Sequence, residues 1–144
     1  MINKTAPEGN VPLYLFRSGK NSHSYEYMGV HNTIKDGKAC TVCRVWAPNA
    51  QAVAITGDFC EWNPEKYPLT KIDDEGYTDE PLKEFDAYKL VITAEDGTVT
   101  YKSDPYAFHA ETRPGTASRY YDISGYKWND GRWFEHKKKY PHYN

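Results

Sequence analysis

The stretch that decides the fold consists of two β-like runs joined by a turn, Leu90-Val91-Ile92-Thr93-Ala94-Glu95-Asp96-Gly97-Thr98-Val99-Thr100-Tyr101. Branched and aromatic residues favour strands on both sides of the turn. The Asp96-Gly97 pair supplies the positive φ angle that a tight hairpin requires. Residues 90–101 therefore predict an antiparallel β-hairpin.

Similar short runs continue in both directions from this hairpin, separated by turn signals such as Asp36-Gly37 and Asn63-Pro64. The expected strands are 25–34, 39–47, 51–58, 67–72, 76–82, 86–95, 98–103 and 118–122. Seven or eight short strands within about 100 residues are typical of two packed antiparallel sheets. The predicted fold class is all-β, an immunoglobulin-like antiparallel β-sandwich of seven to eight strands over residues 25–122.

The two ends of the chain depart from this pattern. Residues 1–24 are polar apart from an apolar patch at 11–16, and they predict an irregular N-terminal leader whose patch docks on a neighbouring element. Residues 123–144 predict a linker. A short helix is expected only near 128–139, where Asp130 precedes Trp133 and Phe134.

Composition agrees with a β-rich domain of ordinary size. The 144 residues contain 13 Tyr, 4 Trp and 5 Phe, which suits strands and amphipathic surfaces better than a helical bundle. Eighteen basic residues oppose 20 acidic ones, giving a formal charge of -2, so no broad positive field is expected and nucleic acid is not an expected partner. No apolar run reaches the roughly 18 residues that would cross a membrane.

Three cysteines, Cys40, Cys43 and Cys60, are an odd number without a secretory leader, which favours a reducing cytoplasm over a disulfide scaffold. The Cys40–Cys43 spacing resembles redox or zinc motifs. However, residues 39–47 are expected to form a strand, on which side chains three apart point to opposite faces. No metal site is therefore predicted.

The sequence predicts no catalytic centre and no cofactor. Carboxylates such as Asp58 and Glu61 are scattered, and no pair is specified at the spacing that a glycosidase needs. The histidines lie in different segments without a nucleophile motif, and phosphate-cradling glycine loops are absent.

One loop differs from the others because it presents a tryptophan after a strand that ends at Gly57-Asp58. The indole of Trp62 either caps a hydrophobic edge or forms a platform for the apolar face of a sugar ring. Asn63 or Lys89 would then supply hydrogen bonds to sugar hydroxyls. The alternation in residues 86–92 places Lys89 on the face opposite Tyr88, and an isolated strand lysine of this kind is more often simple edge protection.

These residues carry a family resemblance. Residues 25–126 resemble the carbohydrate-binding module of family 48, through Arg44-Val45-Trp46-Ala47-Pro48-Asn49-Ala50, then Gly57-Asp58-Phe59 with Trp62-Asn63, and then Tyr88-Lys89. Residues 102–118 are similar to the segment typical of bacterial 1,4-α-glucan (glycogen) branching enzymes. Residues 13–16 with 25–31 resemble the N-terminal lead-in of that family, and residues 128–133 resemble its exit toward a catalytic barrel.

The resemblance implies a binding site and a partner. Trp62 would stack glucose rings, Lys89 would bond sugar hydroxyls, and Tyr101 is the nearest match for a second aromatic residue. Cys60-Glu61 replaces an Asn-containing pair that is common in this loop, which removes hydrogen-bond donors.

In the family that the chain resembles, the catalytic residues lie in a (β/α)8 barrel. Such a barrel needs about 250 residues, so none of the family's catalytic residues can be assigned in this chain. The expected function is therefore a non-catalytic, cytoplasmic module of glycogen biosynthesis. It would bind α-glucan (glycogen or malto-oligosaccharide) beside the catalytic barrel of a branching enzyme.

Two alternatives remain open. In the first, the domain is purely structural and packs on the barrel through a surface formed by Tyr106, Phe108, Trp128 and Trp133. The second is a free-standing glycan-sensing subunit, for which only residues 1–24 and 123–144 would be available as partner-binding elements.

Overall fold

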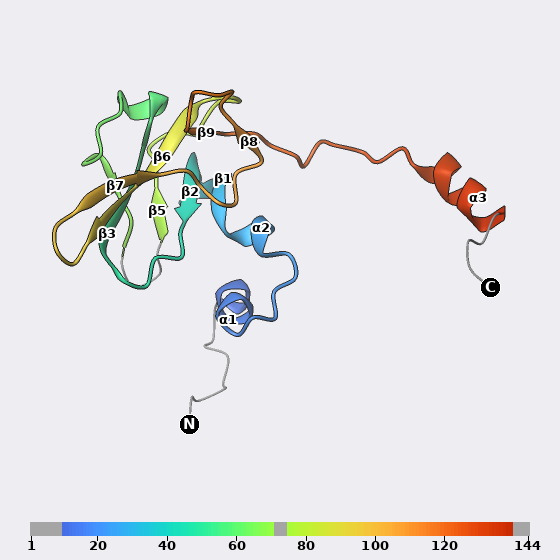
Figure 1. The fold of residues 1–144 in the computed structure, drawn as a ribbon, viewed down its shortest axis with the longest axis horizontal. Coiled ribbons are helices and arrows are strands. Elements are labelled where there is room, and N and C mark those ends of the chain that lie inside the picture. The colour runs from blue at the N-terminus through green and yellow to red at the C-terminus, as the bar shows by residue number, and fades with distance from the viewer. Residues whose placement is uncertain (1–9, 71–74, 140–144) are drawn as a thin grey trace.

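A computed structural model describes residues 10–70 and 75–139 of the chain, and it shows two packed antiparallel sheets (Figure 1). The smaller sheet has the order β1 (Gly29–Lys35), β2 (Lys38–Arg44) and β5 (Glu75–Tyr77). The larger sheet has the order β4 (Tyr67–Pro68), β3 (Ala50–Gly57), β6 (Ala87–Ala94), β9 (Ser118–Arg119) and β8 (His109–Ala110), and β7 (Val99–Lys102) also pairs with β6. This architecture confirms the immunoglobulin-like β-sandwich, with nine strands in the described residues.

The predicted hairpin is confirmed as β6 and β7. Leu90 pairs with Lys102 and Thr93 pairs with Val99, and the Ala94 N–H donates to the Thr98 carbonyl at 2.9 Å. Gly97 closes the turn with a φ of 84°, in the left-handed region that glycine adopts without strain. The first part of β6, Ala87 and Tyr88, pairs instead with β9 on the same side.

The core lies between the sheets and draws on both. Ile55, Tyr88 and Leu90 of the larger sheet pack with Val30 and Cys43 of the smaller sheet, and all are at least nine-tenths buried. Cys43 belongs to this cluster, whereas Cys40 is buried outside it, which agrees with the expected divergence of their side chains along β2.

The prediction of an irregular leader is wrong for residues 11–17, which form helix α1 (Val11–Arg17). The Asn10 side chain caps this helix by accepting from the Leu13 N–H at 3.1 Å, and Pro12 fits its first turn. Its apolar patch does dock, because the Phe16 ring contacts the Trp46 ring edge-on at 5.6 Å. Residues 1–9 lie outside the described part of the chain.

The first expected strand begins later than predicted. Residues 24–27 form the single-turn helix α2 (Ser24–Tyr27), and β1 starts only at Gly29. Gly29 has a φ of 91°, and a Cβ there would lie 2.9 Å from the Cβ of Tyr106. The chain can therefore make this turn into β1 only at a glycine.

Several more expected strands are shortened, among them 39–47, which ends as β2 at Arg44, and one strand was not expected. β4 and β5 keep only part of 67–72 and 76–82, and residues 71–72 lie outside the described part. After β5 the chain leaves the sheet because the Thr78 hydroxyl donates to the Glu80 carbonyl and Leu82 turns to Asn32. β9 keeps two residues of 118–122, and β8 lies in a segment where no strand was predicted.

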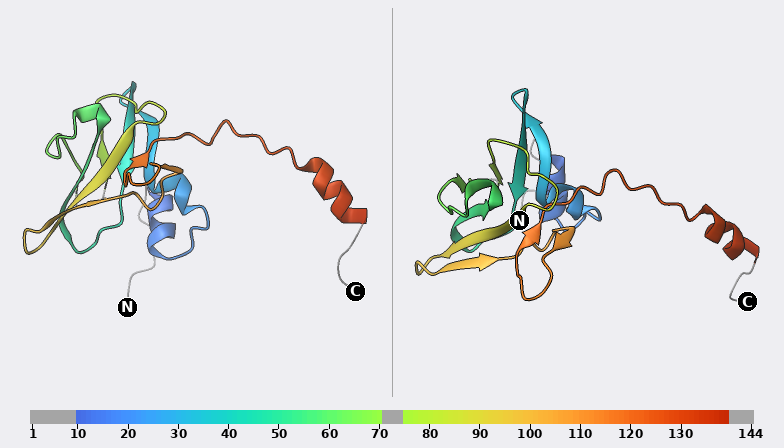
Figure 2. Two further views of the ribbon diagram at one scale, coloured as in Figure 1. Left: turned by 45° about the horizontal axis from the view of Figure 1, so that its top comes forward. Right: turned by 90° about the horizontal axis from the view of Figure 1, so that it is seen from above.

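The C-terminal arm, residues 123–139, extends away from the sandwich and ends in α3 (Gly131–Lys139) (Figures 1 and 2). The helix confirms the expectation for 128–139. Every residue of this arm is exposed.

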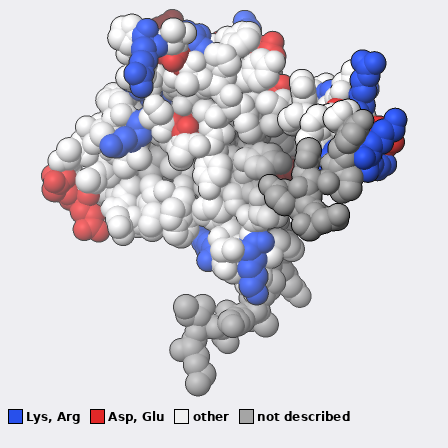
Figure 3. Space-filling model, turned by 45° about the vertical axis from the view of Figure 1, so that its right-hand side comes forward, with Lys and Arg blue, Asp and Glu red and all other residues white. Residues whose placement is uncertain are grey.

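Charge is dispersed on the face shown in Figure 3, where basic and acidic side chains lie in several small groups among uncharged residues. Within residues 10–70 and 75–139, none of the helices is long and apolar enough to cross a membrane.

Candidate functional site

The site is organised by Asp58, the first residue of a 3-10 turn, η1 (Asp58–Cys60), at the end of β3. One carboxylate oxygen, Oδ1, accepts a hydrogen bond from the indole Nε1 of Trp62 at 3.0 Å. The other, Oδ2, accepts one from the backbone N–H of Ala87 at 2.9 Å. A single side chain thus joins the Trp62 ring to the start of β6.

The backbone under Trp62 adopts a conformation that bulky residues rarely take. Glu61 and Trp62 have φ angles of 52° and 59°, both in the left-handed region. The loop is held there by the Trp62 N–H, which donates to the Gly57 carbonyl at 3.0 Å. The buried thiol of Cys60 also contacts Gly57 and Thr56. The indole remains 39% exposed, so it is accessible to a ligand as well as anchored.

Lys89 lies on β6 two residues after Ala87, on the same face of the strand, so the two Cα atoms are about 6.7 Å apart. It pairs across the sheet with Thr56, while the neighbouring Tyr88 and Leu90 face the core. Its Nζ donates to the Thr116 hydroxyl at 2.7 Å. An ammonium group has three donors, so further hydrogen bonds from Lys89 remain available.

Tyr101 joins the same face through the hairpin register. It lies opposite Val91, which makes it a diagonal neighbour of Lys89, at a typical Cα separation of about 7–8 Å. Its side chain is 47% exposed. The structure therefore places Tyr101 and Lys89 on one surface, with Trp62 tied to the strand that carries Lys89.

Asn63 makes two hydrogen bonds within its own turn. Its side-chain oxygen accepts from the Glu65 N–H at 2.9 Å, and its backbone N–H donates to the Cys60 carbonyl. The amide NH2 group has no partner among the described residues and can donate outward.

Sequence reasoning missed two residues of this site, Asp58 and Thr116. In the sequence Asp58 is one of several scattered carboxylates, although an acid directly after Gly57 and four residues before Trp62 is a signal that it can reach the indole. Thr116 is distant in sequence from Lys89, and only the folding of residues 103–117 back onto β6 brings its hydroxyl to the ammonium group.

A second carboxylate holds β6 from its core side. Asp104 accepts from the Tyr88 hydroxyl at 2.8 Å and from the Tyr106 N–H at 2.8 Å. Burial raises the pKa of Asp104 above its ordinary value, and burial also raises the pKa of Tyr88. Since Asp58 anchors Ala87 and Asp104 anchors Tyr88, the strand that carries Lys89 is fixed at two consecutive residues.

The four rings of the expected docking surface are divided between the sandwich and the arm. Tyr106 lines a hollow together with Phe16 and Trp46. The Phe108 ring contacts Tyr25 and His31, at 6.2 Å in each case. Trp128 contacts Tyr126, and Trp133 contacts Phe134, all on the arm.

Comparison with known proteins assigns this fold to a family. The family described as "Carbohydrate-binding module 48 (Isoamylase N-terminal domain)" matches residues 27–107, which include β1 to β7. The chain is also similar to proteins named 1,4-alpha-glucan branching enzyme GlgB from three bacteria. It is 43% identical to that of Geobacillus stearothermophilus over 134 residues, which cover 90% of this chain and 21% of the relative.

The identity is 41% over 127 residues for Bacillus mycoides (strain KBAB4), covering 86% of this chain and 20% of the relative. The identity is 37% over 147 aligned residues for Francisella philomiragia subsp. philomiragia, covering 99% of this chain and 23% of the relative. The chain thus spans about a fifth of the length of the curated relatives it matches. With its two-sheet architecture and a family match over more than half its length, the chain belongs to family 48 of the carbohydrate-binding modules.

Proposed function

We propose that this chain binds α-glucan on the face formed by Trp62, Lys89 and Tyr101, as a non-catalytic module of a 1,4-α-glucan branching enzyme. The observation that carries the proposal is the Asp58 carboxylate, which fixes a partly exposed indole to the strand that presents Lys89. The relatives' names support the choice of α-glucan and of the parent enzyme.

The chemistry of the face suits glucose units. An indole offers an apolar surface to the C–H face of a pyranose ring. Lys89 and the amide of Asn63 provide donors for hydroxyl oxygens, and the phenol of Tyr101 both donates and accepts. Because these groups are held by hydrogen bonds and by sheet register, little side-chain freedom is lost on binding.

The expected affinity is modest. Ring stacking contributes on the order of 1–3 kcal/mol by analogy with base stacking. A face with one tryptophan, one tyrosine and a few hydrogen bonds would then bind glucan with a Kd of roughly high-micromolar to millimolar concentration. Such a value suits a module that holds long chains near a catalytic domain while allowing them to move.

Retention on an amylose or glycogen gel tests the proposal directly. Trp62→Ala should abolish retention, because it removes the stacking surface while the core cluster stays intact. Asp58→Asn should weaken binding by roughly tenfold, because it replaces a charge-assisted hydrogen bond to the indole with a neutral contact. Trp128→Ala, which removes an exposed indole of the arm, is the matched control and should bind as the parent chain does.

Circular dichroism and an amide NMR spectrum of each variant show whether the sandwich is retained. If a folded Trp62→Ala variant still binds glucan, the face is not the site. If the unmodified chain itself is not retained by amylose or glycogen, the structural role beside a barrel is the better interpretation.

A further inference from the structure

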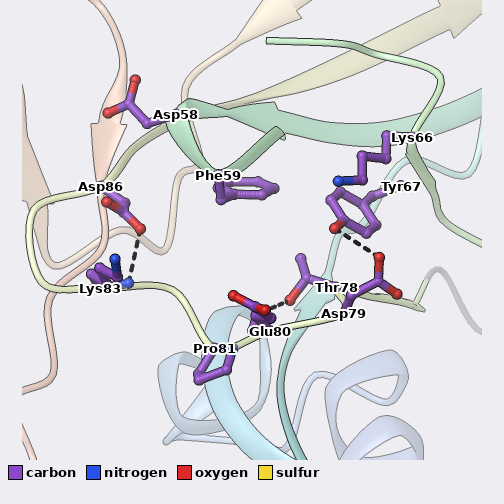
Figure 4. A pocket seen from close by; sticks show the side chains of 10 residues that line it. All are labelled: Asp58, Phe59, Lys66, Tyr67, Thr78, Asp79, Glu80, Pro81, Lys83 and Asp86. Atoms are coloured by element: carbon purple, nitrogen blue, oxygen red, sulfur yellow. Dashed lines mark hydrogen bonds between the residues drawn. The ribbon is translucent and has the colours of Figure 1, made fainter. Parts of the chain in front are cut away.

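A cleft beside Asp58 lies between the larger sheet and the segment that follows β5 (Figure 4). It has a volume of about 450 Å³, which is within the usual range for small-ligand sites. Its walls are η1 and β4 on one side and the segment 78–86 on the other. The lining residues are Asp58, Phe59, Lys66, Tyr67, Thr78, Asp79, Glu80, Pro81, Lys83 and Asp86.

The apolar part of the cleft is formed by two rings that pack together and by a proline. The Phe59 ring packs against the Tyr67 ring with their centroids 5.7 Å apart, and Figure 4 shows both rings on one side of the cleft. A Cβ on Gly57 would lie 2.8 Å from the Phe59 ring, so the absence of a side chain there allows the ring its position. Phe59 is only half-buried, and Pro81 is exposed on the opposite wall, so both offer surface to the C–H groups of a ligand.

The polar part of the cleft provides donors and acceptors together. The carboxylate of Glu80 and the ammonium group of Lys83 form no hydrogen bond or ion pair with the described residues. Asp79 uses one oxygen to accept from the Tyr67 hydroxyl at 3.1 Å, and Asp86 uses one to accept from the Lys83 N–H at 2.8 Å, so each keeps an oxygen for a ligand.

This mixture favours a neutral ligand with many hydroxyl groups. Each hydroxyl can donate to a carboxylate and accept from an ammonium group. A metal ion is less well matched, because no three acidic, cysteine or histidine side chains of the described residues converge as a metal site requires.

The cleft adjoins the Trp62 indole, because one residue belongs to both sites. Asp58 lines the cleft, and its carboxylate is the group that binds the Trp62 indole. We propose that the cleft is a second subsite for the same α-glucan chain, and that it holds glucose units beyond those stacked on Trp62. This inference rests on the proposed function of the Trp62 face, and it assigns to the module a preference for longer chains.

Calorimetric or NMR titration with a series from maltose to maltoheptaose tests the inference. The affinity of the unmodified chain should rise with ligand length once the ligand is long enough to extend beyond the Trp62 indole into the cleft. Glu80→Ala and Lys83→Ala should reduce the affinity for maltoheptaose by roughly tenfold, since each removes a hydrogen bond to a charged group, and should leave maltose binding unchanged. Both residues are exposed, so these variants are expected to fold normally.

Glu26→Ala and Lys38→Ala are the matched controls, because they remove the same charges from exposed positions outside the cleft. Both should show the full rise in affinity with length.

The outcomes separate the two proposals. If the affinity does not depend on length, or if the cleft variants behave as their controls do, the second subsite is refuted while the Trp62 face stands. If no member of the series binds and a folded Trp62→Ala variant is indistinguishable from the parent chain, the proposed function itself fails and the subsite with it. A perturbation of the Phe59 and Lys83 amide resonances by maltoheptaose and not by maltose would support the subsite directly.

Discussion

Two regions of the molecule expose tryptophan side chains, and they do so in opposite ways. In the loop after β3, the Trp62 ring is 39% exposed and is bound to Asp58, on a backbone held in the left-handed region. In the C-terminal arm, Trp128 and Trp133 are 79% and 57% exposed, and their ring contacts are with neighbours on the arm itself. The more exposed rings are therefore the less firmly placed ones.

The exposed fraction of a ring therefore does not tell whether the ring is held in a fixed position where a ligand could meet it. A ring that must be ordered by its ligand loses conformational freedom on binding, at a cost of about 0.5–1.5 kcal/mol for a side chain. The Trp62 ring has already lost that freedom during folding, through a carboxylate that also anchors β6. The left-handed angles at Glu61 and Trp62 indicate that the surrounding contacts are strong enough to hold a strained loop.

The largest expected effect comes from Gly57→Ala, which should break the well-held region. A Cβ at this position would lie 2.2 Å from the Ala87 carbonyl oxygen and 2.8 Å from the Phe59 ring, so backbone and ring must both move. We expect the free energy of unfolding to fall by about 3 kcal/mol or more, which corresponds to a drop in Tm of over about 10 °C for a domain of this size. Thermal unfolding followed by circular dichroism measures this.

The matched control is Gly125→Ala on the arm, where a Cβ would meet nothing within 4 Å. Its Tm should equal that of the parent chain. Equal stability of the two variants would show that the tight approach of η1 to β6 does not support the fold.

A smaller effect, dependent on pH, is expected from Asp104→Asn. Burial raises the pKa of Asp104 above 3.8 in the folded chain, so the folded state holds this proton more tightly than the unfolded state does. The stability that this group contributes is therefore fully present below pH 3.8 and is lost as the pH rises through the raised value, by about 1.4 kcal/mol for each tenfold difference in proton affinity.

Urea unfolding at several pH values gives the free energy of unfolding of the parent chain and of the Asp104→Asn variant. The parent value minus the variant value should decrease as the pH rises. Asp36→Asn, at an exposed turn position, should differ from the parent chain by less than about 0.5 kcal/mol at every pH. If the free energy of unfolding of the parent chain instead rose relative to that of the Asp104→Asn variant as the pH increased, the hydrogen bonds from Tyr88 and Tyr106 would outweigh the effect of burial on Asp104.

The elements that were predicted correctly are those whose signals are local. The 90–101 hairpin needed only β-favouring residues and an Asp-Gly turn, and the helix near 128–139 needed only a capping residue and a suitable run. The errors occur where a contact between residues distant in sequence determines whether a segment forms a strand. The 76–82 run leaves the sheet because Leu82 bonds to Asn32, a residue 50 positions away, and β8 forms only by pairing with β9.

The residues of the candidate site also fall into those with local sequence signals and those that depend on distant contacts. Trp62 and Lys89 were identified from their own segments and from a resemblance, and the structure places Tyr101 beside Lys89 through hairpin register. Asp58 and Thr116 could not be assigned from residue type, since acids and threonines are common at surfaces. Their roles follow from hydrogen bonds that span loops, namely Asp58 to Ala87 and Thr116 to Lys89.

The smallest effect is expected from the arm, and it completes the comparison. The double substitution Trp128→Ala with Trp133→Ala removes two large rings, yet both are more than half exposed, so little apolar burial is lost. The free energy of unfolding should change by less than about 0.5 kcal/mol, and glucan retention should be the same as for the parent chain. A drop of several degrees in Tm would instead show that the arm folds back onto the sandwich in solution. In that case its tryptophans, like Trp62, would be held in place by the domain and would be candidates for the same glucan surface.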